Sequence, residues 1–331
     1  ESMPLYRQEK QLERLGVFIP RQTLANWIMH GANTWLQLIY NAMYKELLQH
    51  DILHADETTL QVLTEPDRPA KSKSYMWLYR TGRESSPIIL YEYQQTRASK
   101  HPRRFLADYQ GYLHVDGYAG YNGLTHVKLV GCWAHARRKF TEALQALPES
   151  AETSAVKAKE GLAYCNKLFE IERDLKDKLP EERYKERLER SQPILDAFSA
   201  WLREQTPRVL PKSALGQAIK YCRNQWERLI VFLEDGRLEI DNNRGERSIK
   251  PFVIGRKNWL FSNTAKGAKS SAIIYSVVET AKENGLDPFK YLSYLFEVLP
   301  NMDTTDQTKL NQLLPWSTTI PKECRIPNKS K

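Results

Sequence analysis

The chain has 331 residues, of which 41% are hydrophobic, so it can bury at least one full core and its length indicates two or three structural units. This composition excludes a disordered chain. The formal charge of +9 at pH 7 and the pI of about 9.2 favour an anionic partner, and nucleic acid is the most common one.

The sequence gives no sign of a membrane partner or of an oxidising compartment. No apolar run reaches the length needed to cross a bilayer, and residues 1–4 do not begin a signal peptide. We therefore expect a cytoplasmic protein. The cysteines are scattered without a C-x-x-C pair, which predicts reduced thiols rather than a zinc ribbon or a disulfide framework; they are Cys132, Cys165, Cys222 and Cys324.

The first 50 residues have a helical pattern. The sequence predicts one helix over residues 5–15 that ends at Gly16, a second from about Thr23, and a third from about Trp35 to Leu48. The residues of the first helix that are predicted to face inward are Leu5, Leu12 and Leu15.

This pattern predicts a small helix-turn-helix-like segment over residues 1–50. Its second helix would lie in a major groove of DNA, with Arg21, Gln22 and Asn26 reaching the bases or phosphates. The alternative is a helical bracket that packs on the next domain, because many small helix pairs share this pattern.

From residue 52 the periodicity changes from helical to extended. Strands are predicted near residues 52–63, 75–79 and 88–93, and the turn at Thr81-Gly82-Arg83 favours a hairpin between the last two. The opening of this domain is therefore predicted to be a three-stranded antiparallel meander.

A helix over about residues 99–108 then precedes a fourth strand over 112–116, and a short helix precedes a fifth over 127–133. This order of elements is that of the ribonuclease-H-like fold. We therefore predict an α/β fold with a mixed five-stranded sheet and flanking helices. Its catalytic core would occupy residues 51–135 and 237–300.

Between the two parts of this core, residues 136–236 predict an all-helical insertion rich in Glu, Lys and Arg. One helix of the second part begins near Asn242. Another spans about residues 268–284, ends at Gly285, and carries Glu279, which is expected to face solvent rather than bind metal. Residues 301–331 predict a C-terminal tail that docks on the domain.

Three acids stand at places that suit phosphodiester chemistry: Asp56, Asp116 and Glu246. Mg²⁺ prefers carboxylate oxygens, and a pair of such ions activates the attacking oxygen and stabilises the departing one. The sequence therefore predicts a site for two Mg²⁺ ions, which Mn²⁺ could replace. Taken singly, each acid could instead end a strand or form a surface ion pair.

Neighbouring residues compete for these roles. Glu57 is predicted to point away from Asp56 because successive strand residues face opposite ways, and Asp241 is typical of a helix N-cap. Cys132 and His135 are three residues apart and could bind a metal, but two ligands without a second pair favour a structural role.

Several polar residues near the acids could hold DNA phosphates, although solvated helix faces explain them nearly as well. Trp259 could stack on an unpaired base, but a tryptophan in an apolar stretch is more often part of a core. The candidates for phosphate contact are Arg137, Arg138, Lys139, Asn243, Arg247, Arg256 and Lys257.

Long motifs of the chain resemble transposases of the insertion sequence 66 family, which belong to the DDE class. The resemblance implies a ribonuclease-H-like core, a helical insertion before the glutamate, and Asp56, Asp116 and Glu246 as the DDE triad. The motifs are HADET (54–58), VDGYAGYNGL (115–124), GCWAHARRKF (131–140), EIDNNRGERSIKPFVIGRKNWLF (239–261), YLSYLFEVLP (291–300) and LLPW (313–316).

Members of this family usually carry, ahead of this region, a coiled-coil segment and a cysteine-rich zinc-binding module. Neither is present in this sequence, which resembles the C-terminal two-thirds of such a protein. The resemblance implies a bacterial, nucleoid-associated protein encoded beside small accessory proteins. Because transposition joins two DNA ends, we expect at least a homodimer on DNA.

The leading hypothesis is a DNA transposase that cleaves a strand at the element's end and uses the freed 3′ hydroxyl to attack target DNA. Without the resemblance, the residues indicate only a metal-dependent nuclease or strand transferase. Hydrolysis and transesterification of a phosphodiester use the same carboxylates, so the residues do not distinguish the two reactions. A structure-selective nuclease of the same fold is one alternative. The other is a non-catalytic DNA-binding or regulatory protein derived from a transposase.

Overall fold

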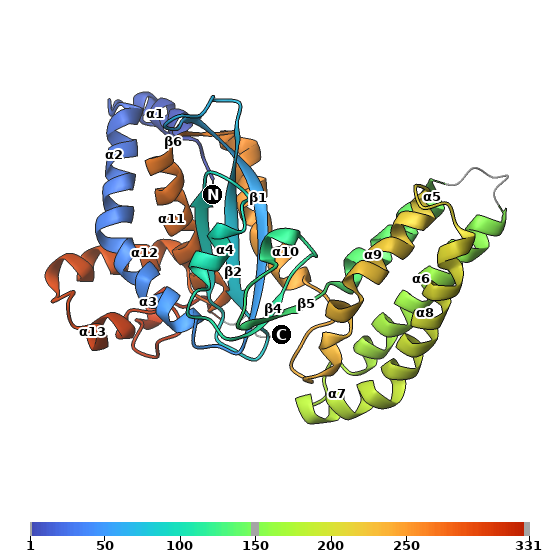
Figure 1. The fold of residues 1–331 in the computed structure, drawn as a ribbon. Helices are drawn as coiled ribbons and strands as arrows, with labels where there is room; N and C mark the ends of the chain where they lie inside the picture. Colours follow the sequence, from blue (N-terminus) through green and yellow to red (C-terminus); the bar gives the residue numbers. More distant parts are fainter. Residues whose placement is uncertain (1, 147–151, 328–331) are drawn as a thin grey trace. The chain divides into compact units, whose positions relative to one another are not determined.

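Figure 1 shows the fold in a computed structural model that describes residues 2–146 and 152–327. The chain folds into two compact units. The first comprises Glu1–Gln110 and Gly245–Lys331, and the second comprises Gly111–Arg244. Each unit buries its own hydrophobic residues.

An antiparallel meander forms the centre of the first unit. β1 (Ile52–Thr64) pairs with β2 (Lys73–Thr81), and β2 pairs with β3 (Ile89–Gln94). These strands are rich in β-branched and aromatic residues, which suit a pleated surface. The predicted three-stranded meander is therefore confirmed.

A short additional strand corrects the prediction of a five-stranded sheet. β6 (Ser262–Thr264) pairs in parallel with the end of β1, where Val62 lies opposite Ser262. The described residues thus contain six strands in a mixed α/β fold. The prediction missed β6 because its three residues are all polar and show no alternation of apolar and polar side chains.

The helix α11 (Ala265–Glu283) covers the meander and closes its edge. Strand β3 is the edge strand, and the side chains of Ser276 and Thr280 accept hydrogen bonds from the main-chain N–H groups of Tyr91 and Ile89, at 2.8 and 2.9 Å. These bonds satisfy strand groups that would otherwise have no partner, which is one way to protect a sheet edge.

The end of α11 is as predicted, but one of its acids is not. Gly285 has a φ of 72°, and the N–H of Leu286 bonds to the carbonyl of Ala281 at 2.9 Å, which is the pattern of a glycine-capped helix end. Glu279 was expected to face solvent, and this is wrong. Its residue is 8% exposed, and its carboxylate pairs with Lys282 at 2.7 Å.

The N-terminal helices differ from the prediction in two ways. The run from α2 (Arg21–Gly31) through a π-helical turn (Ala32–Leu36) to α3 (Gln37–Leu47) is continuous, whereas two separate helices were predicted. The first helix, α1 (Leu5–Arg14), does end at Gly16, whose φ is 78°. However, Leu15 was predicted to face inward and is 71% exposed.

The C-terminal tail packs on the first unit through its apolar residues. Leu310, Leu313 and Leu314 are buried, and the hydroxyl of Tyr291 donates to the carbonyl of Leu313 at 2.6 Å. The predicted docking is confirmed for the tail as far as residue 327. The remaining α-helices of this unit are α4 (Lys100–Phe105), α12 (Pro288–Val298) and α13 (Gln307–Gln312), and α10 is described with the site below.

The second unit begins with two strands and continues as a helical bundle. β4 (Gly111–His114) and β5 (Val127–Val130) pair in parallel. Short 3₁₀ turns occur at Ala119–Tyr121, Thr206–Arg208 and Val231–Leu233 here, and at Leu299–Asn301 and Lys322–Cys324 in the first unit. The helices are α5 (Trp133–Gln145), α6 (Glu152–Asp174), α7 (Pro180–Glu186), a π-helical turn (Arg187–Ser191), α8 (Gln192–Gln205) and α9 (Ala214–Leu229).

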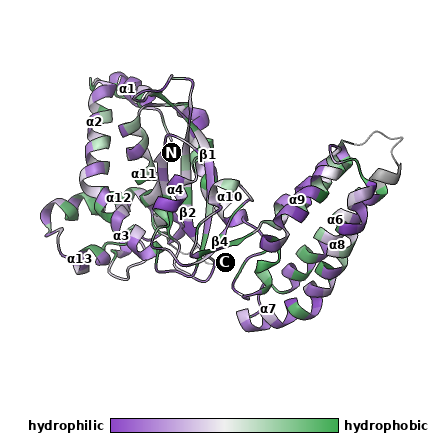
Figure 2. Ribbon diagram, in the orientation of Figure 1, coloured by the Kyte–Doolittle hydropathy of each residue, from purple (hydrophilic) through white to green (hydrophobic). Residues whose placement is uncertain are grey.

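The bundle has an aromatic core and a buried ion pair. Phe198 lies against Trp133, Phe140 and Trp201, with ring centroids 5.8 to 6.0 Å apart. The guanidinium of Arg187 is fully buried and donates to the carboxylate of Glu172 at 2.7 Å. In Figure 2 the helices carry both hydrophobic and hydrophilic residues, as expected of helices that bury one face. Residues 147–151 lie outside the described residues.

None of the helices in residues 2–146 and 152–327 is both long enough and apolar enough to span a bilayer.

Candidate functional site

Asp56 lies inside strand β1 rather than at its end. Residues Leu53 to Ala55 before it are buried, and Asp56 itself is half-buried opposite Leu78 of β2. Its Oδ1 accepts a hydrogen bond from the main-chain N–H of Glu57 at 2.8 Å. This bond orients the carboxylate through the adjacent peptide.

The neighbouring acid, Glu57, is engaged elsewhere in the first unit. Its side chain is 1% exposed and forms an ion pair with Arg97, whose Nε donates to Oε1 at 2.8 Å. A buried carboxylate with a paired arginine is a structural feature more often than a metal ligand. This pairing agrees with the expectation that Glu57 and Asp56 point apart.

Glu246 lies in the first turn of α10 (Asn243–Trp259) and is half-buried. The helix packs on the meander because Ile249 and Phe252 belong to the same buried cluster as Leu60 and Val62 of β1. The first unit therefore carries two of the three predicted acids, Asp56 on a strand and Glu246 on a helix that packs against that strand.

Two further contacts hold the start of α10. The buried guanidinium of Arg80 on β2 donates to the hydroxyl of Ser248 at 2.6 Å, and the hydroxyl of Tyr91 donates to the Ser248 carbonyl. Arg80 also pairs with Glu283 of α11 at 3.0 Å. Ser248 is two residues from Glu246, so these contacts fix the turn that carries the acid. No local pattern in the sequence links β2 to α10, so these contacts could not be predicted from it.

The acids that compete with Glu246 have partners of their own in the second unit. The guanidinium of Arg244 donates to Glu239 at 2.7 and 3.0 Å. Asp241 accepts from the main-chain N–H of Asn243, the first residue of α10, at 3.0 Å, and from its side-chain amide at 2.6 Å. Because α10 begins at Asn243, its N-cap position is Asn242, and the prediction of Asp241 as the N-cap is off by one residue. The amide of Asn243 is engaged in this contact with Asp241.

Asp116 belongs to the second unit and follows β4 by two residues. It is half-buried, and its Oδ1 accepts from the main-chain N–H of Tyr118 at 2.9 Å. Gly117 between them has a φ of 93°, a conformation that other residues rarely adopt. The sequence thus forms a tight turn that orients the Asp116 carboxylate.

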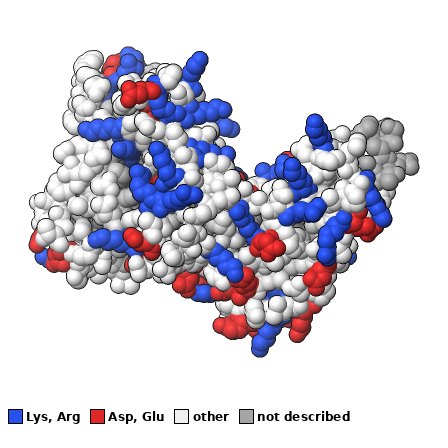
Figure 3. Space-filling model, viewed as in Figure 1, with Lys and Arg blue, Asp and Glu red and all other residues white. Residues whose placement is uncertain are grey.

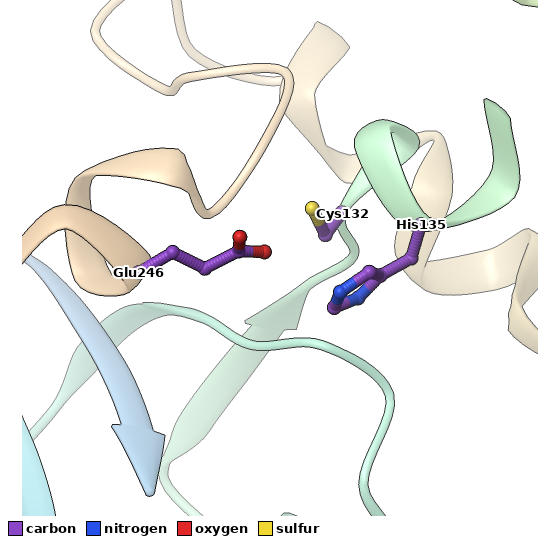
Figure 4. A group of neighbouring side chains, drawn as sticks. All are labelled: Cys132, His135 and Glu246. Carbon is purple, nitrogen blue, oxygen red and sulfur yellow. The ribbon is translucent and has the colours of Figure 1, made fainter. Parts of the chain in front are cut away.

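Figure 4 draws Cys132 and His135 at the start of α5, and Glu246 of the first unit. The Cys132 sulfur lies within 4.8 Å of a ring nitrogen of His135, and it accepts a hydrogen bond from the main-chain N–H of Asn242 at 3.2 Å. Cys132 is fully buried. The buried Cys132 thiol thus holds the main chain at Asn242 in place. This contact agrees with the structural role favoured for Cys132 and His135.

Burial raises the pKa of three tyrosines and two cysteines in or near these helices and strands. The pKa of the Cys165 thiol rises to about 12, and that of Cys222 rises well above its ordinary value, in both cases chiefly through burial. Burial also raises the pKa of Tyr221, Tyr79 and Tyr91. These groups keep their protons at neutral pH, so the two cysteines are unreactive core residues.

Many of the residues predicted to contact DNA are exposed, and the side-chain amide of Gln22 donates to that of Asn26 at 3.1 Å. Arg21, Gln22, Asn26, Arg138, Arg247 and Lys257 are exposed. Figure 3 shows Lys and Arg side chains over the visible face of both units.

Three further residues predicted to contact DNA also bond to other residues of the protein: Arg137, Lys139 and Arg256. Arg256 donates to the hydroxyl of Thr58 at 3.2 Å and to the carbonyl of Thr59, so it ties α10 to β1. Arg137 donates to Asn166 at 2.7 Å, and Lys139 pairs with Glu142 at 3.2 Å. Trp259 packs edge-on against Phe252, with centroids 5.3 Å apart, which agrees with a core position.

Comparisons with known proteins agree with the motifs. Residues 1–270 match the family described as Transposase IS66 family, and residues 276–316 match the IS66 C-terminal element. No solved structure matches the chain.

Two similar curated proteins come from Sinorhizobium fredii and are both named as uncharacterized. Protein y4qI is 32% identical over 96% of this chain and 60% of its own length, and protein y4jD is 31% identical over 95% and 63%. The chain thus spans about three-fifths of the length of these relatives. Because the two family matches together cover nearly all of its residues, the chain belongs to the IS66 family of DDE-class transposases.

Proposed function

We propose that this chain carries the catalytic part of a DNA transposase. It would cleave a strand at each end of its element in a metal-dependent reaction, and the freed 3′ hydroxyl would then attack target DNA. The observation that carries this proposal is the IS66 family match over residues 1–270, which includes all three acids of the expected triad. The triad would consist of Asp56, Asp116 and Glu246.

The carboxylates suit the metal that this chemistry needs. Oδ1 of Asp56 and Oδ1 of Asp116 each accept a main-chain N–H, at 2.8 and 2.9 Å. An ionised carboxylate offers about four acceptor positions, and each of these bonds uses one of them and orients the group. Half-buried carboxylates match the oxygen preference of Mg²⁺, and Mn²⁺ could replace it. When bound, two such ions would activate the attacking oxygen and stabilise the leaving one.

We also propose that the core is ribonuclease-H-like. The support is the order of strands along the chain, with an antiparallel meander of β1 to β3 followed by the parallel strands β4 and β5. The core would comprise residues 51–135 and 237–300, with the helical insertion at 136–236. Residues 1–50 would form the helix-turn-helix-like segment and residues 301–331 the tail.

The substrate would be the DNA of the element ends and the target. The chain has a net charge of +9, which would attract the phosphate backbone, and the cations Arg21, Arg247 and Lys257 are exposed to solvent, where they could make such contacts. Strand transfer joins two ends, so we expect at least a homodimer on DNA. Small accessory proteins encoded by the element would be further partners.

The test uses labelled DNA that carries the terminal repeats flanking this gene. The chain is incubated with this DNA and Mg²⁺, and the experiment is repeated with Asp56→Asn, Asp116→Asn and Glu246→Gln. We expect cleaved and joined products from the native chain, and a loss of at least about 100-fold from each variant, because each removes one negative metal ligand. Asp303→Asn is the matched control, since Asp303 is an exposed acid in the tail.

The outcomes separate the proposed function from its alternatives. Products that are cut but never joined would favour a structure-selective nuclease. Binding of DNA without any metal-dependent product would favour a regulatory protein derived from a transposase. Full activity in any one of the three acid variants would remove that residue from the proposed triad.

A further inference from the structure

The main-chain carbonyl of Asp116 accepts hydrogen bonds from two helices of the second unit. The hydroxyl of Tyr221 on α9 lies 3.1 Å from this oxygen, and Nδ1 of His135 on α5 lies 3.3 Å from it. All three residues belong to the same unit. Asp116 and Tyr221 are 105 positions apart in the sequence, so only the folded helical bundle brings the tyrosine to this carbonyl.

The turn after Asp116 also rests on α9. A Cβ atom at Gly117 would lie 3.2 Å from the side chain of Gln225 and 3.4 Å from the hydroxyl of Tyr221. Tyr221 and Gln225 are four residues apart and therefore share one face of the helix. This face contacts the turn at the point where the backbone takes the positive φ of Gly117, 93°.

The directions of the two hydrogen bonds follow from the acceptor. A carbonyl oxygen only accepts, so Tyr221 donates its O–H, and His135 must carry a proton on Nδ1. Burial raises the pKa of Tyr221, which keeps this hydroxyl protonated at any ordinary pH.

These contacts determine where the Asp116 carboxylate points. Its Oδ1 is bonded to the N–H of Tyr118, and its carbonyl is held by two helices, so the two peptide groups that flank Gly117 are both held. Gly117 follows directly. Because glycine is conformationally permissive, the turn sequence by itself would leave the peptide group between Asp116 and Gly117 free to rotate. The helices therefore supply a restraint that the turn sequence does not.

We propose that Tyr221, together with His135, is a positioning residue for the Asp116 carboxylate, and that the helical insertion thereby contributes to metal binding. This inference rests on the proposed function, because it takes Asp116 as a metal ligand. Partners of this kind that orient a ligand usually change metal affinity or activity by about 10- to 100-fold when they are removed.

The main test compares Tyr221→Phe with the unsubstituted chain. This variant keeps the ring and removes only the donated hydroxyl. We expect the Mg²⁺ concentration for half-maximal cleavage to rise about tenfold or more, while the rate at saturating Mg²⁺ changes much less. Mn²⁺ binding, measured from the electron paramagnetic resonance signal of the free ion, should weaken in parallel and needs no DNA. Tyr184→Phe is the control, since Tyr184 is 40% exposed on α7.

A second pair of variants tests the role of His135. It also keeps the inference testable if Tyr221→Phe does not fold. The side-chain amide of His135→Asn places a donor near the position of Nδ1, whereas His135→Ala has none. We expect His135→Ala to weaken Mn²⁺ binding and His135→Asn to restore it in part. Equal binding by these two variants would overturn the role of His135, and circular dichroism shows whether each variant is folded.

The Asp116→Asn variant distinguishes a failure of this inference from a failure of the proposed function. If Asp116→Asn is inactive and Tyr221→Phe requires the same Mg²⁺ as the native chain, Tyr221 is not a positioning residue and the proposed function stands. If Asp116→Asn keeps full activity and Mn²⁺ binding, the assignment of Asp116 fails, and the inference fails with it.

Discussion

At the scale of single residues, Glu92 on β3 has a carboxyl group whose ionised form is disfavoured by burial. Its side chain is 19% exposed and pairs with the more exposed Arg104 at 2.8 Å. Burial nevertheless raises the pKa of Glu92, and Arg104 offsets this only in part. A carboxyl with a raised pKa in the folded state contributes stability at low pH, which is lost as the pH rises through that value.

We therefore expect Glu92→Gln to stabilise the chain at pH 7, because the variant removes the buried charge. The gain over the native chain should shrink toward pH 4, where the native carboxyl is increasingly protonated. Calorimetric unfolding at the two pH values measures it. A gain that is larger at pH 4 than at pH 7 would contradict this account, and Glu297→Gln, at an exposed position, is the control.

At the scale of elements, the position of α10 depends on the buried contact between Arg80 and Ser248. Arg80 is 2% exposed, and its guanidinium donates to the Ser248 hydroxyl at 2.6 Å. We expect Ser248→Ala to lower the free energy of unfolding by about 1–3 kcal/mol, because it leaves one donor of a buried cation without this partner. Urea denaturation measures the change. Ser86→Ala, at an exposed serine, should be nearly neutral, and equal stabilities of the two variants would refute the role of the contact.

At the scale of the whole molecule, a bound metal should stabilise the fold. A ligand that binds only the folded state adds about 2.7 kcal/mol when its concentration is 100 times its dissociation constant. We expect Mg²⁺ to raise the unfolding temperature of the native chain and of Asp303→Asn, and to raise that of Asp116→Asn much less. Differential scanning fluorimetry across a Mg²⁺ series tests this. The same increase in all three proteins would place the ion away from Asp116.

Local signals in the sequence were enough for much of the fold. The extended runs at residues 75–79 and 88–93, with the turn at Thr81-Gly82-Arg83, predicted the hairpin of β2 and β3, and Gly285 predicted the end of α11. These features depend on neighbours in the chain, which is why the sequence alone reveals them. The candidate acids came from motifs that resemble a family, and the family match then agreed with that resemblance.

Contacts between distant segments decided the rest. At Gly236 a Cβ would lie 1.7 Å from the carbonyl oxygen of Pro180, so the position requires glycine because two segments approach closely. The polar strand β6 forms only because β1 offers it a partner, and Tyr221 reaches Asp116 only through the folded bundle. The sequence by itself determined most of the local elements and the three candidate acids. The tertiary structure decided which side chains hold them, because burial and long-range hydrogen bonds depend on neighbours that no local pattern specifies.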